Sequence, residues 1–239
     1  MEWLNYSIVG GLIRKVMNQR KTLFQIALDI LTKQEAKELL TPKMLNTVDI
    51  VEIGTPLIIR YGLSIVEQIK DWIKGDKILF ADTKIADAGH WETCEAISSG
   101  ANMVSVLAGA SFNTLEEVRD ATQLNQAKMV VDIIDLSLSD ESKIKFINTL
   151  NPDYLCIHLA TDVVKKGGSL LEFSRQLSFV SSRRLPLMVA GGIHPQNLLD
   201  ILKNIQPAVV VAGSSITKAS DPELEAQNMR RIIDETILY

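Results

Sequence analysis

Three charged side chains follow an apolar run in the stretch "ILFADTKIADAGHW" of this 239-residue chain. Asp82, Lys84 and Asp87 have the spacing D-x-K-x-x-D. Two acids around one amine can form an ion pair in a solvated turn. They can also hold a lysine protonated where a reaction needs positive charge. The elements that position these residues decide between the two interpretations.

Eight short apolar or β-branched runs recur from Leu23 onward, each followed by a turn and a segment with helical spacing. Such alternation is typical of a parallel sheet covered by helices. An open doubly wound sheet would place a glycine-rich turn after the first strand, but "ALDILTKQEA" has no glycine. We therefore predict one α/β domain, a (β/α)8 TIM barrel over residues 22–239. The predicted strands are Leu23–Asp29, Val48–Gly54, Lys77–Asp82, Asn102–Gly109, Lys128–Ile134, Asp153–His158, Pro186–Gly192 and Ala208–Gly213.

The predicted helices lie between these strands, and one further helix is expected before them. Residues 1–21 contain an apolar run followed by basic residues, the reverse of a secretory signal, and no segment could span a membrane. We predict an additional N-terminal helix there and a cytoplasmic protein without a membrane partner. The barrel helices are predicted at Lys33–Leu45, Leu63–Lys74, Trp91–Ser99, Leu115–Leu124, Ser139–Thr149, Leu170–Ser181, Pro195–Lys203 and Pro222–Leu238.

Bulk composition excludes several classes of function. A net charge of −4 argues against a general nucleic-acid partner, which would require a basic face. Cys94 and Cys156 lack metal-ligand spacing, so we expect reduced thiols in the core. Trp72 and Trp91 fall in predicted helices, where packing is their expected role.

Polar residues gather where the predicted strands end. The chemistry of a barrel lies at the carboxyl ends of its strands. Charged groups there are costly unless they are paired or bound to a cation. Four of the first five strands end in an acid, which points to a site rather than to chance. The residues are Asp29, Glu52, Asp82 with Lys84, Asp132 and His158.

Each of these residues has a chemistry that suits a role. Glu52 and Asp82 offer hard oxygen atoms on adjacent strands, which suits Mg²⁺ and the stabilisation of an enediolate. Lys84 should share a strand face with Asp82, and the acids should keep it protonated. His158 is the candidate general base. Asp87 either pairs with Lys84, reaches across a subunit interface, or simply starts the next helix.

Glycines follow the last two predicted strands. The sequences are "VAGGI", with Gly191 and Gly192, and "VAGSSIT", with Gly213 and Ser214. Glycine lets backbone N–H groups approach a ligand, and these two turns are the usual phosphate site of a barrel. We therefore expect a small phosphorylated substrate.

From Leu23 onward the chain resembles the orotidine 5'-monophosphate decarboxylase suprafamily. The matching segments occur in order, and they are "ALD", "VEIGTPLI", "ADTKIADAG", "GANMVSVL", "VAGGI" and "VAGSSIT". The resemblance implies a small barrel and a homodimer in which Asp87 serves the neighbouring subunit's site. Glu52 stands where orotidine decarboxylases carry a lysine, which implies the Mg²⁺-dependent branch of hexulose-phosphate synthases and keto-gulonate-phosphate decarboxylases.

Four positions separate the two activities of that branch. The decarboxylases tend to have Glu, Arg, Thr and Arg where this chain has Asp132, Thr161, Ala190 and Ser214. Losing both arginines removes cations that would hold an extra carboxylate. The resemblance therefore favours the synthase branch, although Ala160 stands where synthases commonly have Gly.

The synthase branch implies a Mg²⁺-dependent aldolase that joins ribulose 5-phosphate and formaldehyde. Asp29 would then help to hold the substrate, Asp132 would support the base, and the glycine turns would hold the phosphate. The alternatives are a keto-gulonate-phosphate decarboxylase and a sugar-phosphate-binding barrel without turnover.

Overall fold

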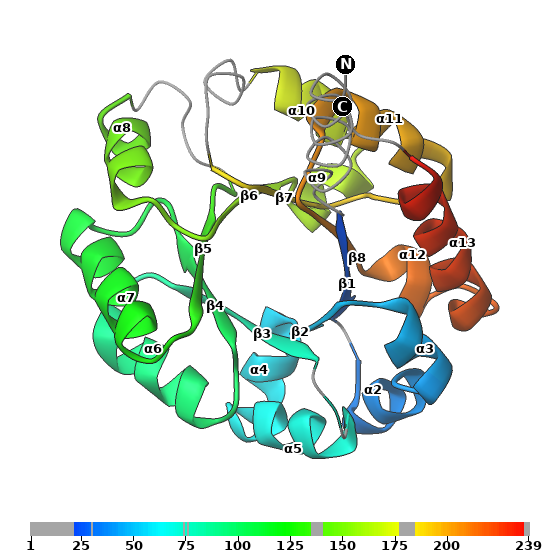
Figure 1. The fold of residues 1–239 in the computed structure, drawn as a ribbon, viewed down its shortest axis with the longest axis horizontal. Helices are drawn as coiled ribbons and strands as arrows, with labels where there is room; N and C mark the ends of the chain where they lie inside the picture. Colours follow the sequence, from blue (N-terminus) through cyan, green and yellow to red (C-terminus); the bar gives the residue numbers. More distant parts are fainter. Residues whose placement is uncertain are drawn as a thin grey trace, which may run out of the picture.

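A closed ring of eight parallel strands forms the centre of the computed structural model, which describes residues 22–29, 31–73, 75, 77–134, 141–176 and 185–236. Each strand pairs with the next one along the chain, and the eighth closes on the first (Figure 1). The TIM barrel prediction is confirmed. The strands are β1 (Leu23–Leu28), β2 (Ile50–Ile53), β3 (Ile78–Ile85), β4 (Met103–Leu107), β5 (Lys128–Asp132), β6 (Tyr154–His158), β7 (Leu187–Ala190) and β8 (Val209–Ala212).

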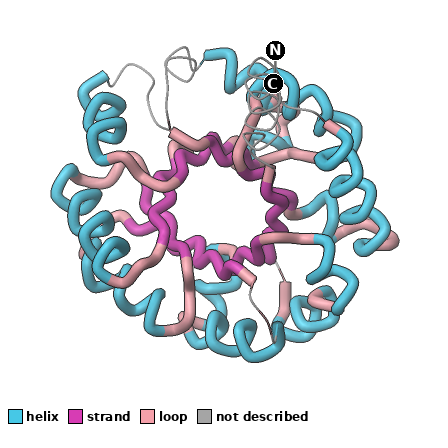
Figure 2. The backbone as a smooth tube through the Cα atoms, viewed as in Figure 1, coloured by secondary structure: helices cyan, strands magenta, loops and turns pink. Residues whose placement is uncertain are grey.

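The helices form an outer ring around the strands, as Figure 2 shows. Among the described residues, no helix is both long and apolar enough to cross a membrane. The predicted N-terminal helix lies in residues 1–21, outside the described residues. The helices are α2 (Lys33–Leu39), α3 (Pro42–Thr47), α4 (Thr55–Tyr61), α5 (Ser64–Ile73), α6 (Gly89–Ser98), α7 (Phe112–Leu124), α8 (Glu141–Leu150), α9 (Thr161–Lys165), α10 (Leu170–Gln176), α11 (Pro195–Ile205), α12 (Ser214–Thr217) and α13 (Pro222–Glu235).

The observed helices differ from the predicted ones in two ways. The single helix expected from Lys33 to Leu45 is two helices, because Pro42 cannot continue a helix and Thr41 caps a new one through its hydroxyl. Short helices α4, α9 and α12 follow β2, β6 and β8, where we expected only turns. All three stand at the carboxyl ends of strands, so they line the same end of the barrel as the site.

Apolar packing has two layers. The larger cluster lies between the strands and the helices, and the smaller one fills the barrel interior. Strand residues alternate between the two layers, since successive side chains point to opposite faces. The interior layer is Ala27, Ile50, Phe80, Met103, Val130, Cys156, Met188, Ala190, Val209 and Val211. This apolar floor excludes water from beneath the polar groups at the strand ends.

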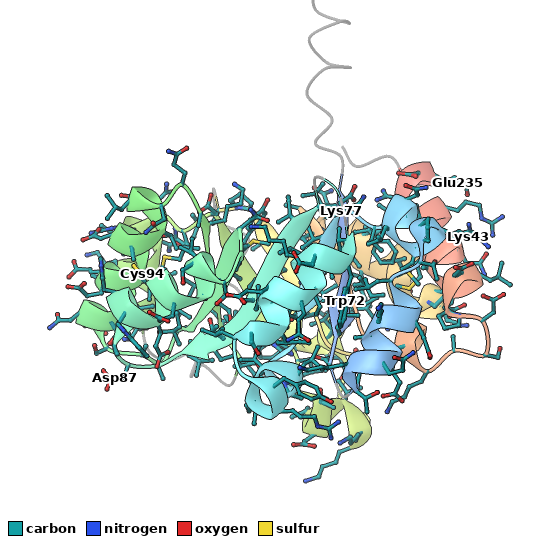
Figure 3. The ribbon with its side chains drawn as sticks, turned by 90° about the horizontal axis from the view of Figure 1, so that it is seen from below. Lys43, Trp72, Lys77, Asp87, Cys94 and Glu235 are labelled. Atoms are coloured by element: carbon teal, nitrogen blue, oxygen red, sulfur yellow. The ribbon has the colours of Figure 1, made fainter. Side chains whose placement is uncertain are left out.

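The amino and carboxyl ends of the strands lie at opposite ends of the barrel. In Figure 3, Lys77 stands near the upper edge, just before β3, and Asp87 stands at the lower edge, just after it. All strands are parallel, so their carboxyl ends meet at the edge of Asp87. The predicted site residues therefore share one end of the barrel.

Helix α7 offers a direct test of the outer layer. Leu115 has no exposed surface, whereas Leu124 of the same helix is 75% exposed. We expect Leu115→Ala to lower the free energy of unfolding by about 2–5 kcal/mol through lost burial and a cavity. The matched Leu124→Ala should change it by less than about 0.5 kcal/mol. Urea denaturation of both variants measures this, and equal effects would contradict the packing described.

Candidate active site

Four ionisable side chains from three strands meet at the carboxyl end of the barrel. The Nζ atom of Lys84 lies 3.0 Å from Asp82 Oδ2 and 2.8 Å from Asp132 Oδ2. The Nδ1 atom of His158 lies 2.9 Å from the same Asp132 oxygen. The structure thus joins residues that are up to 76 positions apart (158 − 82) into one chain of contacts.

Lys84 reaches Asp82 through an irregular strand. Ala81 pairs with Val104 and Ile85 with Val106, so four steps along β3 pass against two along β4. Lys84 has a φ of 47°, in the left-handed region that costs a side-chain-bearing residue about 1–2 kcal/mol. Lys84 lies on the same side as Asp82, as predicted, and contacts it, but our reason, regular strand alternation, was wrong. This bulge places the ammonium group of Lys84 beside Asp82.

Hydrogen bonds hold the bulge and its acid in place. Ser105 Oγ donates to Asp82 Oδ1 at 2.7 Å and accepts from the Lys84 backbone N–H at 2.9 Å. Thr55 Oγ1 donates to Asp82 Oδ2 at 2.8 Å. Both Asp82 oxygens are therefore oriented by hydroxyl groups from neighbouring elements, β4 and α4.

Electrostatics fix the charge states of the central pair. Burial alone would lower the pKa of Lys84, but the carboxylates of Asp82 and Asp132 outweigh it and raise that pKa. Burial alone would raise the pKa of Asp132. The hydrogen bond from His158 and the charges of His158 and Lys84 lower it to about 2. Lys84 is thus a fixed cation, as expected, and not a free base.

The pKa values of the acids at the ends of β1 and β2, Asp29 and Glu52, are shifted upward instead. Burial raises the pKa of Glu52 well above its usual value, and the charges of Asp82 and Asp29 add to the effect. Burial, followed by the charge of Asp82, likewise raises the pKa of Asp29. Three acids here face one ammonium group, so full ionisation of this side of the site is unfavourable unless a further cation is bound.

A small cavity of about 20 Å³ lies between these groups, and Glu52, Asp82, Lys84, Asp132 and His158 all line it. Its size admits one water molecule or one cation. Two carboxyl groups on paired strands fit a hard divalent ion, which would stabilise their ionised forms. The residues present therefore fit the expected Mg²⁺.

Another group of ligand atoms lies on the opposite side. Asp132, Cys156 and His158 bring their ligand atoms within 4.8 Å of one another. Lys84 already places its positive charge 2.8 Å from Asp132 there. This group therefore does not require a metal ion to balance its charge. Cys94 and Cys156 are both free thiols, as predicted, but only Cys156 lies in the core, since Cys94 is half-buried.

The carboxylate of Asp29, just after β1, lies close to the turns that follow β2 and β8. A Cβ atom on Gly54 would lie 2.4 Å from Asp29 Oδ1, and one on Gly213 would lie 2.9 Å from Asp29 Oδ2. Glycine at both turns therefore leaves room for this carboxylate beside Glu52. Gly213, which we assigned to the phosphate site, contacts Asp29 and does not line the cavity that the other glycines border.

A larger cavity of about 580 Å³ lies outside β7 and β8. The predicted phosphate residues Gly191, Gly192 and Ser214 line it, together with Lys218 at the end of α12. Gly191 and Gly192 have φ angles of 98° and 68°, which side-chain-bearing residues rarely adopt. Lys218 adds a cation that we did not predict.

Asp87 is not part of the central cluster. It is exposed, and its Oδ1 atom accepts a hydrogen bond from the backbone of Ala88. Its pairing with Lys84 within one chain is not found among the described residues.

Ile59 of α4 is 79% exposed and Trp91 of α6 is 65% exposed, and both helices pack against β3. The packing role expected for Trp91 was therefore wrong.

Sequence reasoning missed several residues that shape the site. Ser105 and Gln25 stand in apolar strands, and their polarity at interior positions was a signal that alternation could have revealed. Thr55 and Lys218 depend on helices that we did not predict. No local pattern of the sequence places either one at the site.

The fold and this cluster define a (β/α)8-barrel enzyme with a lysine–carboxylate centre at the strand ends. The chain belongs to the orotidine 5'-phosphate decarboxylase / HUMPS family, whose model matches residues 22–229.

Relatives within that family match nearly their whole length. The chain is 36% identical over 211 residues to 3-hexulose-6-phosphate synthase 2 of Staphylococcus saprophyticus, covering 88% of this chain and 96% of that one. It is 35% identical to 3-hexulose-6-phosphate synthase of Staphylococcus aureus, covering 88% and 98%. A crystal structure of 3-hexulose-6-phosphate synthase from Salmonella typhimurium superposes with a TM-score of 0.82 at 32% identity, covering 90% and 99%.

The charge on Asp132 should make the free energy of unfolding depend on pH in the acid range. Its pKa of about 2 lies below the ordinary 3.8, so the carboxylate stabilises the fold above pH 3.8 and loses this effect as the pH falls through about 2. Without added metal, wild type should lose about 2 kcal/mol more unfolding free energy than Asp132→Asn between pH 5 and 2. Urea denaturation at several pH values measures this. Parallel pH profiles would contradict it.

Proposed function

We propose that this chain is a Mg²⁺-dependent aldolase that joins D-ribulose 5-phosphate and formaldehyde to D-arabino-hex-3-ulose 6-phosphate. The observation that carries the proposal is the contact chain from Asp82 through Lys84 and Asp132 to His158. It combines a fixed cation with an oriented base. The names of the relatives support the same reaction.

Asp132 orients the proposed base, His158. Because the pKa of Asp132 is held at about 2, its carboxylate accepts a hydrogen bond from Nδ1–H of His158. The lone pair of His158 then lies on Nε2. We infer that Nε2 takes the proton from C1 of ribulose 5-phosphate.

Charge at the reacting carbons is balanced by the rest of the cluster. A Mg²⁺ ion held by Glu52 and Asp82 would polarise the substrate carbonyl and stabilise the negative charge of an enediolate. The protonated Lys84 stabilises the same charge. Carbon C1 then bonds to the carbonyl carbon of formaldehyde as its C=O π bond breaks, and the new oxyanion receives the proton that Nε2 of His158 had taken. Gly191, Gly192, Ser214 and Lys218 hold the phosphate.

The two alternatives fit the site less well. Within the described part of the chain, no arginine lines either cavity, so the extra carboxylate of a keto-gulonate phosphate would meet only Lys84 and Lys218. A barrel that only binds sugar phosphates needs the phosphate turns. It does not need a base oriented by a carboxylate.

A turnover assay tests the reaction. Purified protein should consume formaldehyde only when ribulose 5-phosphate and Mg²⁺ are both present. Glu52→Gln should reduce kcat/KM at least ~100-fold, because the metal site loses a charged ligand. Lys203→Ala, on the outer helix α11, is the control and should keep wild-type activity. Release of CO₂ from keto-gulonate phosphate without formaldehyde consumption would instead favour the decarboxylase.

We further propose a homodimer in which Asp87 completes the neighbouring site. Asp87 is exposed and bonds to the backbone of Ala88, and the exposed Ile59 and Trp91 on helices beside β3 provide apolar surface for a second copy. The cytoplasmic location and the absence of a nucleic-acid or membrane partner stay predictions.

Mixed dimers test the role of Asp87. Asp87→Ala and Lys84→Ala subunits should each be inactive as pure dimers. After random exchange of subunits, about a quarter of wild-type activity should return, since half the dimers are mixed and each has one intact site. Activity of the mixture measures this. If Asp87 served its own chain, mixing would restore nothing.

A further inference from the structure

Gln25 is a polar residue buried in the apolar interior of the barrel. It has no exposed surface, and its strand neighbours are Ile50 of β2 and Val211 of β8. A buried amide is costly unless its polar atoms are bonded. Its Nε2 atom donates to Glu52 Oε2 at 2.6 Å, so the amide lies directly against an acid of the site.

The other end of the amide has no partner. Gln25 Oε1 is buried without a hydrogen bond among the described residues, and Gln25 lines the 20 Å³ cavity together with Glu52 and Asp82. The unbonded acceptor therefore lies beside a space of about the size of one small ligand.

An amide has a property that suits this position. A lysine or arginine beneath Glu52 would also donate a hydrogen bond, but its charge would neutralise the carboxylate and repel a second cation. Glutamine orients the carboxylate and leaves its charge available. No hydrogen bond to the other oxygen, Glu52 Oε1, is found in the described part of the chain.

We propose that Gln25 is a positioning residue that holds Glu52 Oε2, so that Oε1 is presented to a divalent cation. The inference rests on the proposed function, which assigns the cation to Glu52 and Asp82. Groups that orient metal ligands typically change metal affinity about 10- to 100-fold when removed. The same loss is expected when the amide of Gln25 is removed.

Manganese binding tests this without turnover. The full chain, stripped of metal, is titrated with Mn²⁺, and the free ion is measured by electron paramagnetic resonance. Gln25→Leu should bind Mn²⁺ about 10- to 100-fold more weakly than wild type. Gln25→Met, which is unbranched like glutamine, provides a second variant if the first does not fold. Thr93→Val removes a buried, unbonded hydroxyl from α6, away from the cavity, and should bind like wild type.

The outcomes separate the inference from the function on which it rests. If wild type binds Mn²⁺ and a folded Gln25 variant binds it equally well, the positioning role is wrong while the proposed function stands. If wild type binds no Mn²⁺ and Glu52→Gln changes nothing, the proposed metal site itself fails. A positioning role also predicts that kcat recovers at saturating Mg²⁺ while the Mg²⁺ concentration for half-maximal rate rises about 10- to 100-fold. A loss of kcat that Mg²⁺ does not restore would contradict it.

Discussion

The ammonium group of Lys84 lies between the carboxylates of Asp82 and Asp132, within 3.0 Å of each, and the rest of the site is arranged around it. The pair of acids offsets the cost of burying a cation and keeps it charged. The cation in turn helps to keep Asp132 ionised, and only an ionised Asp132 orients His158 through Nδ1. Lys84 and His158 together keep Asp132 ionised in the middle of this contact chain.

This arrangement requires a departure from regular strand geometry. The left-handed backbone at Lys84 and the register shift between β3 and β4 store local strain. Ser105 offsets that strain by accepting from the Lys84 N–H while donating to Asp82. The bulge is therefore part of the site rather than a defect of the sheet.

Charge is distributed unevenly around the barrel. Strands β1 to β3 contribute Asp29, Glu52 and Asp82, whose mutual repulsion and burial favour a bound cation. Strands β5 and β6 contribute Asp132 in contact with His158, and the turns after β7 and β8 border the larger cavity. In the proposed reaction, a sugar phosphate that spans these sectors would meet charge neutralisation, proton transfer and phosphate binding around one ring. The dry apolar layer beneath them strengthens each electrostatic contact.

The sequence by itself determined the barrel and most of the site residues, because both depend on patterns along the chain. Alternating strands and helices set the topology, and the carboxyl ends of parallel strands must share an edge, so these patterns alone sufficed to assign Asp29, Glu52, Asp82, Asp132 and His158 to one end of the barrel. Only the tertiary structure decided how they touch. The bulge at Lys84, the contact of Gln25 with Glu52 and the position of Lys218 depend on the register between neighbouring strands and on short helices after them. Those features arise from packing between segments far apart in the sequence, for which the local pattern of residues carries no signal.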